Sequence, residues 1–312
     1  MKKVSIVGWY GHKNIGDESF REVFTRQLGH YDLSFGERPD LSADAIILGG
    51  GGVVCKKYLD GLESYRKPIY AVGVDISVNG EEWQRIKSLP FRFLFIRSFE
   101  YWQIASKEAS NVCYCPDIAF SLFEKKEKRD VKKPTGRIGV ILSADISKYE
   151  HLRCHISNAL KELSNKYNEI VYITMCNDKA SLDFKMNQDV FEKTNHGHQI
   201  LMTPDSVSET LEVISSLDVL ITMRFHGAIF ATICGVPFLS VANKGKCSLF
   251  CDQEGILDSY IELSDINEFK ILNRVFRVDN YRYAGKLKDI SKENAELIDQ
   301  MFDYIRFNLD LS

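Results

Sequence analysis

An arginine and a histidine two residues apart are the part of this sequence best suited to chemistry. Arg224 and His226 lie between an apolar run typical of a buried strand, 219–222, and an apolar run typical of a helix, 228–234. The N-terminus of a helix offers unpaired N–H groups and a positive dipole end, which attract anions. A guanidinium there can bind a phosphate or carboxylate through two parallel hydrogen bonds, and an imidazole can transfer a proton near neutral pH. The segment therefore predicts an anion site with an acid–base group beside it.

Two glycine-rich segments, 8–16 and 49–52, each follow an apolar run of their own. Consecutive glycines cost backbone entropy, so we expect something to approach the backbone closely there. The first segment is not Gly-x-Gly-x-x-Gly and lacks a Gly-Lys-Ser/Thr ending, so it supports neither a dinucleotide site nor a P-loop. For the first segment the alternative is that Asp17 and Glu18 only stabilise the dipole of the helix that they begin. For the second segment the alternative is a tight turn that only joins a strand to a helix.

Two weaker signals involve lysines and histidines. Lys244 and Lys246 follow a buried run, and they fit either an anionic ligand or a solvated loop. His151 and His155 stand four residues apart on a predicted helix, as two metal ligands would. No carboxylate nearby completes a ligand set, so we expect no metal site.

The predicted strands and helices that carry these groups alternate along the chain, in two successive series. Such alternation is typical of parallel sheets covered on both faces. A charged stretch at 124–136 is interpreted as a domain linker, and a single apolar stripe predicts a helix at 286–312. We therefore expect α/β domains at 1–125 and 136–285 that face each other across a cleft, with ligands at the carboxyl ends of the strands. Strands are predicted at 4–8, 44–48, 68–73, 93–97, 112–117, 137–142, 170–175, 219–222 and 238–241.

Composition excludes several classes of protein. A chain of 312 residues with 45% hydrophobic residues has enough apolar material for two domain cores, and a net charge of −3 argues against a nucleic-acid partner. No Cys-x-x-Cys occurs, no signal peptide is recognisable, and no apolar run reaches the roughly 18 residues of a membrane span. We therefore expect a cytoplasmic protein with reduced thiols and no transmembrane segment.

The order of these motifs over residues 4–250 resembles the polysaccharide pyruvyl transferase family. The resemblance rests on the segment from Gly8 to Glu18, the glycines at 49–52, Asp117 after a strand, and the segment 223–237, MRFHGAIFATICGVP. It implies a GT-B-like fold of two Rossmann-like domains, with the terminal helix crossing back to the first. It also implies phosphoenolpyruvate as co-substrate and a saccharide acceptor, which can be lipid-linked, with no nucleotide, metal or other cofactor.

The resemblance implies that a pyruvyl group moves to two sugar hydroxyls as a ketal on a cell-surface or exopolysaccharide precursor. His226 is the expected general acid or base. Arg224 is expected to hold the donor's phosphate or carboxylate. The helix start at Gly227 and the loop residues Asn243 and Lys244 are expected to assist it. The acceptor is expected beside residues of the first domain: Gly11, Asn14, Asp17, Gly50, Gly51, Arg97 and Asp117.

Two alternatives stay open, and a homo-oligomer is compatible with the sequence. A GT-B glycosyltransferase would use the same anion site for the diphosphate of a nucleotide sugar. A non-catalytic relative that binds anions or glycans is supported by Arg97-Ser98, because the family often has Arg-Asp at this point.

Overall fold

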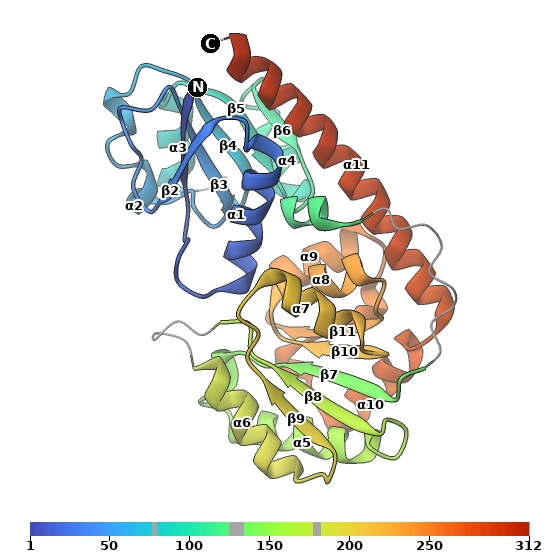
Figure 1. Ribbon diagram of the computed structural model, residues 1–312. Helices are drawn as coiled ribbons and strands as arrows, with labels where there is room; N and C mark the ends of the chain where they lie inside the picture. The colour runs from blue at the N-terminus through green and yellow to red at the C-terminus, as the bar shows by residue number, and fades with distance from the viewer. Residues whose placement is uncertain (77–79, 125–133, 177–181, 312) are drawn as a thin grey trace. The chain divides into compact units, whose positions relative to one another are not determined.

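The computed structural model describes residues 1–76, 80–124, 134–176 and 182–311, and it separates into two compact units. Each unit is built on its own six-stranded sheet, and all named strand pairs are parallel (Figure 1). The predicted α/β class with two Rossmann-like units is therefore confirmed. Most of the predicted linker, 125–133, lies outside the described residues. The first unit comprises Met1–Gly11, Asp17–Leu122 and Glu293–Ser312, and the second comprises His12–Gly16 and Phe123–Lys292.

The first sheet has the strand order β2-β1-β3-β4-β5-β6. Its central strands β3 and β4 consist mainly of aliphatic and glycine residues, and both are buried along their whole length. Because β1 lies between β2 and β3, the chain changes direction at β1 and β3, which is where open sheets bind ligands. The strands are β1 (Lys3–Val7), β2 (Asp32–Gly36), β3 (Ala45–Gly51), β4 (Ile69–Val74), β5 (Phe91–Ile96) and β6 (Val112–Tyr114).

The helices of the first unit bury aromatic residues against this sheet. Phe20 and Phe24 of α1 are almost fully buried, as is Trp83 of α3, whose indole donates to Glu108 at 2.8 Å. The helices are α1 (Ile15–Leu28), α2 (Lys56–Leu59), α3 (Glu81–Ser88) and α4 (Phe99–Ala105).

The second sheet has the order β12-β11-β10-β7-β8-β9, which is the strand order of dinucleotide-binding folds. Its direction changes between β7 and β10, so its switch point lies at the carboxyl ends of these two strands. The strands are β7 (Arg137–Ile141), β8 (Glu169–Ile173), β9 (Gln199–Met202), β10 (Val219–Thr222), β11 (Phe238–Ala242) and β12 (Tyr260–Glu262).

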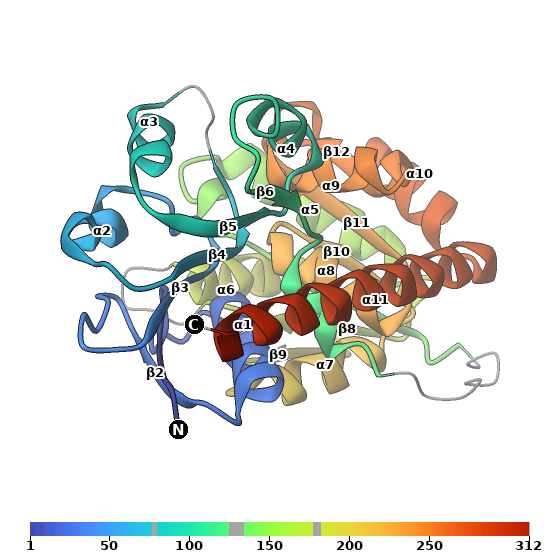
Figure 2. The ribbon, with the colours of Figure 1, turned by 90° about the horizontal axis from the view of Figure 1, so that it is seen from above.

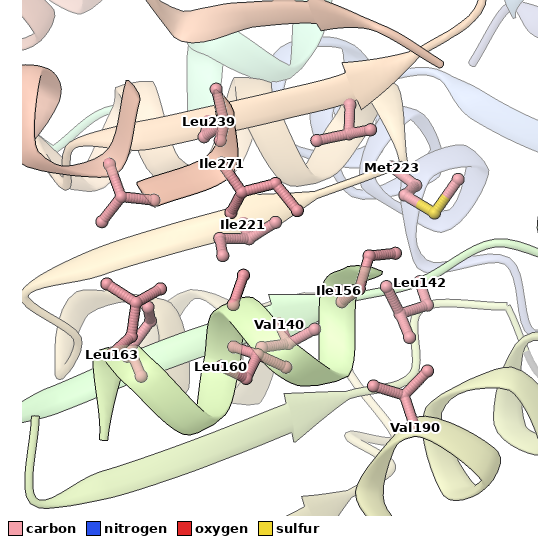
Figure 3. Close-up of a cluster of buried hydrophobic side chains, with 14 of the residues drawn as sticks. Val140, Leu142, Ile156, Leu160, Leu163, Val190, Ile221, Met223, Leu239 and Ile271 are labelled. Atoms are coloured by element: carbon pink, nitrogen blue, oxygen red, sulfur yellow. The ribbon is translucent and has the colours of Figure 1, made fainter. Parts of the chain in front are cut away.

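An apolar stripe of α5 forms the centre of the second unit's core. Figure 3 shows Ile156, Leu160 and Leu163 of α5 beside Val140 of β7 and Ile221 of β10, all of them buried. Burying side chains of this size stabilises a fold by about 1.5–3 kcal/mol each. The helices are α5 (Glu150–Leu163), α6 (Asp183–Thr194), α7 (Val207–Ser215), α8 (Phe225–Cys234), α9 (Lys246–Gln253) and α10 (Glu268–Val278).

The terminal helix α11 (Tyr281–Leu311) is longer than the predicted 286–312 at its start, and it carries the chain from the second unit to the first. Ser291 donates to the carbonyl oxygen of Thr232 in the second unit at 2.8 Å. In the first unit, the ring of Phe302 packs edge-on against Phe24 of α1, and Figure 2 shows the end of α11 beside α1. Within the described ranges, every helix is too short or too polar to span a lipid bilayer.

Three strands, β2, β9 and β12, have no counterpart among the predicted strands. All three lie at the edge of a sheet and most of their residues are partly exposed. Because an edge strand is not buried on both faces, it needs no continuous apolar run, and apolar runs were the signal used for prediction.

Candidate functional site

The Arg224–His226 segment lies at the switch point of the second sheet. It follows β10, which pairs with β7, and the N–H of Met223 donates to the carbonyl oxygen of Ile141 at 2.8 Å. The loops after β7 and β10 therefore leave the sheet side by side. Ligands of open α/β sheets bind in the crevice between such loops.

The turn from β10 into α8 is held by the hydroxyl of Thr222. This oxygen accepts from the backbone N–H of Arg224 at 3.1 Å and donates to the Arg224 carbonyl oxygen at 3.0 Å. A methyl group on Gly227 would come within 2.2 Å of the same oxygen, so only glycine lets the helix pack this closely. The N–H of Gly227 donates to the carbonyl oxygen of Arg224. Close packing against Thr222 therefore requires glycine at position 227, and the expected contact of Gly227 with the donor stays a prediction.

The guanidinium of Arg224 is held by a carboxylate that the sequence did not single out. Asp183 begins α6 and is fully buried. Its oxygens accept from Nε of Arg224 at 2.8 Å and from Nη2 at 2.5 Å, and the N–H of Ala144 donates to it at 3.0 Å. Burial alone would lower the pKa of Arg224, but the bonds and charge of Asp183 outweigh it and raise this pKa. Asp183 therefore joins Arg224 to the loop after β7.

One side of the Arg224 guanidinium stays available for a ligand. The side chain is 32% exposed, and none of the residues that the structure describes accepts a hydrogen bond from Nη1. A guanidinium carries five N–H donors, and Asp183 faces only the Nε–Nη2 edge. The Nη1–Nη2 edge can therefore still bind a planar or tetrahedral anion through two hydrogen bonds.

The segment His12–Gly16 belongs to the second unit and packs beside His226. The N–H of Ile15 donates to the carbonyl oxygen of Met175 at 3.0 Å, and Asn14 forms a β-bridge with Cys176. A methyl group on Gly16 would lie 2.1 Å from Nδ1 of His226, so glycine here is what gives the imidazole its room.

Asn14 has two roles in this segment. Its side chain accepts from the N–H of Gly16 at 3.1 Å, and its backbone bridges to the second sheet. The sequence had placed Asn14 with the acceptor residues of the first domain, whereas its contacts place it in the second unit.

Asn243 and Lys244 follow β11, the neighbour of β10, so they lie at the same edge of the sheet as Arg224. Both side chains are exposed to solvent. The chain then turns at Gly245, whose φ of 150° favours glycine, and α9 begins at Lys246.

Several predicted acceptor residues meet at the switch point of the first sheet. Gly50 and Gly51 end β3 with positive φ, and a methyl group on Gly50 would come within 2.2 Å of the Phe20 ring. A methyl group on Gly51 would lie 3.8 Å from an Asp17 oxygen, so Asp17 borders this turn. Gly11, with φ of +81°, lies after β1 and donates to Glu18 at 2.6 Å. Close packing therefore explains Gly50, and the turn remains a place where a ligand could meet Asp17.

Arg97 is enclosed by carboxylates. Asp75 follows β4, Arg97 follows β5, and Asp117 lies just beyond β6. Nε and Nη2 of Arg97 bind Asp75, the former at 2.7 Å, and Nη1 binds Asp117. Arg97 is only 8% exposed, and although burial alone would lower its pKa, the two carboxylates raise it. The sequence found Arg97 and Asp117 but missed Asp75, although an aspartate directly after a buried strand was an available signal.

Other parts of the described residues offer less. No three His, Cys, Asp or Glu side chains among them could hold a metal ion together. A separate hollow of about 520 Å³ lies between β12 and α10 and includes none of the predicted site residues. Its lining is formed by Tyr260, Ile261, Glu262, Asp265, Phe269, Lys270, Asn273, Arg274 and Arg277.

Comparisons with known proteins agree with the sequence on family and with the topology on fold. The family described as polysaccharide pyruvyl transferase matches residues 4–245. No curated protein matches the sequence. Among solved structures, the chain is similar to MnaA of S. aureus with UDP, at 12% identity and a TM-score of 0.65, covering 100% of this chain and 98% of that one.

Two further solved structures share the fold at similarly low identity. One is UDP-GlcNAc 2-epimerase from Neisseria meningitidis bound to UDP-GlcNAc, with 12% identity, full coverage of both chains and a TM-score of 0.65. The other is Alr3699/HepE of Anabaena with UDP and glucose, with 9% identity, coverage of 99% and 100%, and a TM-score of 0.63. At these identities the likeness concerns the fold alone.

Proposed function

The chain belongs to the polysaccharide pyruvyl transferase family, and we propose that it transfers the pyruvyl group of phosphoenolpyruvate to two hydroxyls of a saccharide as a ketal. The observation that carries this proposal is the partly exposed Arg224 beside His226 at the switch point of the second sheet. Phosphoenolpyruvate has a carboxylate and a phosphate, and the Nη1–Nη2 edge of Arg224 suits either group.

The reaction needs one proton donor and acceptor, the role proposed for His226. A proton adds to the methylene carbon, which becomes the methyl group, and a sugar hydroxyl oxygen attacks the adjacent carbon. The C–O bond to phosphate then breaks, and a second hydroxyl oxygen closes the ketal. The two hydroxyls release two protons, of which one balances the methyl group and one leaves with phosphate. An imidazole can pass the first of these because it changes charge near neutral pH.

The other predicted roles follow from position. Asn243 and Lys244 would contact the part of the donor that Arg224 does not hold. The saccharide would meet the first unit at its own switch point, beside Asp17 and Gly51. Carboxylates accept hydrogen bonds from hydroxyls, which suits Asp17 to a sugar.

A nucleotide-sugar glycosyltransferase is the second candidate, favoured by the fold shared with structures that hold UDP. Thermal unfolding separates the two functions, because a ligand at 100 times its Kd stabilises the folded state by about 2.7 kcal/mol. We expect phosphoenolpyruvate to raise the melting temperature and UDP-GlcNAc to leave it unchanged. The opposite result would replace our proposal with the glycosyltransferase.

We further propose that the reaction uses no metal ion, since an arginine and helix N–H groups can hold the phosphate. Turnover of phosphoenolpyruvate should then be the same with and without EDTA. Loss of turnover in EDTA that a divalent cation restores would contradict this part of the proposal.

A further inference from the structure

Asp183 determines which edge of Arg224 a ligand can reach. Its two oxygens face Nε and Nη2, and they are held in place because one of them also accepts from the N–H of Ala144. The guanidinium therefore cannot turn to offer its Nε–Nη2 edge to a ligand. An incoming anion must approach in one plane and from one direction.

Asp183 also cancels the charge of Arg224. The carboxylate is fully buried beside the guanidinium, so water screens this pair little. Asp145 and Cys176 also act electrostatically on Arg224 in the direction that keeps it protonated, and no lysine bonds to it within the described part of the chain. A small inorganic anion therefore gains little from charge at this site and must gain from geometry.

We propose that Asp183 is a specificity-determining positioning residue, which makes Arg224 select ligands by shape and weakens the binding of free inorganic anions. The inference rests on the proposed function for the identity of the donor. Inorganic phosphate is the product of that reaction, so a site that attracted phosphate by charge alone would be inhibited by its own product. A donor with two anionic groups can make contacts beyond Arg224. Its binding therefore loses less free energy than that of phosphate when the charge of Arg224 is cancelled.

Asp183→Asn tests this inference because it removes the charge and half of the fork. An amide has one acceptor oxygen, and its NH₂ group opposes the N–H of Arg224. We expect phosphate to bind about three- to tenfold more tightly, because the positive charge of Arg224 is no longer cancelled by Asp183. We expect phosphoenolpyruvate to bind about tenfold more weakly, because the edge that it needs is no longer held. Both affinities are measured by calorimetry on the full chain, without turnover.

Opposite changes for the two ligands distinguish specificity from folding. If Asp183 had only a structural role, Asp183→Asn would lower the affinity for both ligands together, and that result would overturn the inference. Asp189→Asn is the matched control, since Asp189 lies on the same helix α6 and pairs with Arg153 at 2.6 Å and Lys193 at 3.1 Å. This control should leave both affinities within about twofold of the parent, as expected for partly exposed ion pairs.

Two further variants separate charge from geometry and guard against misfolding. Asp183→Glu keeps the charge but displaces the two carboxylate oxygens that hold Arg224. It should therefore weaken the binding of phosphoenolpyruvate without strengthening the binding of phosphate. In an Arg224→Gln background, Asp183→Asn should no longer strengthen phosphate binding, because this background has no guanidinium whose charge Asp183 could cancel. Tighter phosphate in either variant would contradict the inference. If the parent binds phosphate but not phosphoenolpyruvate, the proposed donor is wrong, and the phosphate measurements still test Asp183.

Discussion

Arg97 in the first unit and Arg224 in the second each lie just beyond the carboxyl end of a strand of a parallel sheet, but within the described residues they bind different numbers of carboxylates. All three nitrogens of Arg97 bind Asp75 or Asp117, and its side chain is 5% exposed. Among the residues that the structure describes, the side chain of Arg224 binds Asp183 alone, through two nitrogens, and it is 32% exposed.

The difference shows that partners, more than residue type, decide what an arginine at the end of a strand can do. Two carboxylates use every nitrogen of Arg97, so its bonds join three loops of the first sheet. The single carboxylate that binds Arg224 holds its guanidinium in place but leaves the Nη1–Nη2 edge available to a ligand. Rigid positioning of a donor group is what a binding site needs.

The largest effect that would sharpen this comparison concerns the group beside Arg224. His226→Asn should slow turnover about a hundredfold to ten-thousandfold while donor affinity stays nearly unchanged, because the proton transfer is lost and the anion site is kept. Turnover and donor affinity are measured together, with His151→Asn on the exposed face of α5 as the control. A variant that turned over at the parent rate would remove the proposed mechanism.

Replacing Arg97 should lower the stability of the fold. Arg97→Met leaves two carboxylates without their common cation, and breaking a buried ion pair in this way costs about 3–5 kcal/mol. Chemical denaturation should show this loss of stability, while affinity for phosphoenolpyruvate per folded molecule stays unchanged. Weaker donor binding by a fully folded variant would break the comparison, since Arg97 would then serve the ligand as Arg224 does.

Arg224→Lys should affect binding. A lysine keeps the charge but cannot bond to Asp183 and to the donor in one plane. Charge-assisted hydrogen bonds contribute about 1.5–3 kcal/mol, so donor affinity should fall about tenfold to a hundredfold. Calorimetric titration with phosphoenolpyruvate measures this. An unchanged affinity would show that Arg224, like Arg97, has a structural role.

A smaller effect is expected at Gly16. The backbone there permits alanine, but the added methyl group would displace the imidazole of His226. Turnover should fall about tenfold, because small displacements of a reacting group slow catalysis, and donor affinity should not change. Gly197→Ala is the control, since no atom lies within 4 Å of its added methyl group. Equal rates for both variants would mean that the position of the imidazole does not limit the reaction.

Much of the fold could be predicted because buried parallel strands are recognisable in the sequence as apolar runs. The central strands of both sheets were found in this way, whereas the edge strands β2, β9 and β12 were not, since partial exposure removes the signal. The His12–Gly16 segment was assigned to the first domain by its place in the chain. Its contacts with Met175 and Cys176 assign it to the second unit, and no local pattern encodes such contacts.

The sequence by itself determined the chemistry on offer: an arginine and a histidine between a strand and a helix, in an order of motifs that belongs to one family. Only the tertiary structure decided how that arginine is used. Asp183 lies 41 residues from Arg224 and does not directly follow a predicted strand, so nothing local marks it as a partner. A carboxylate becomes the partner of a guanidinium through the path of the chain between them, which packing determines.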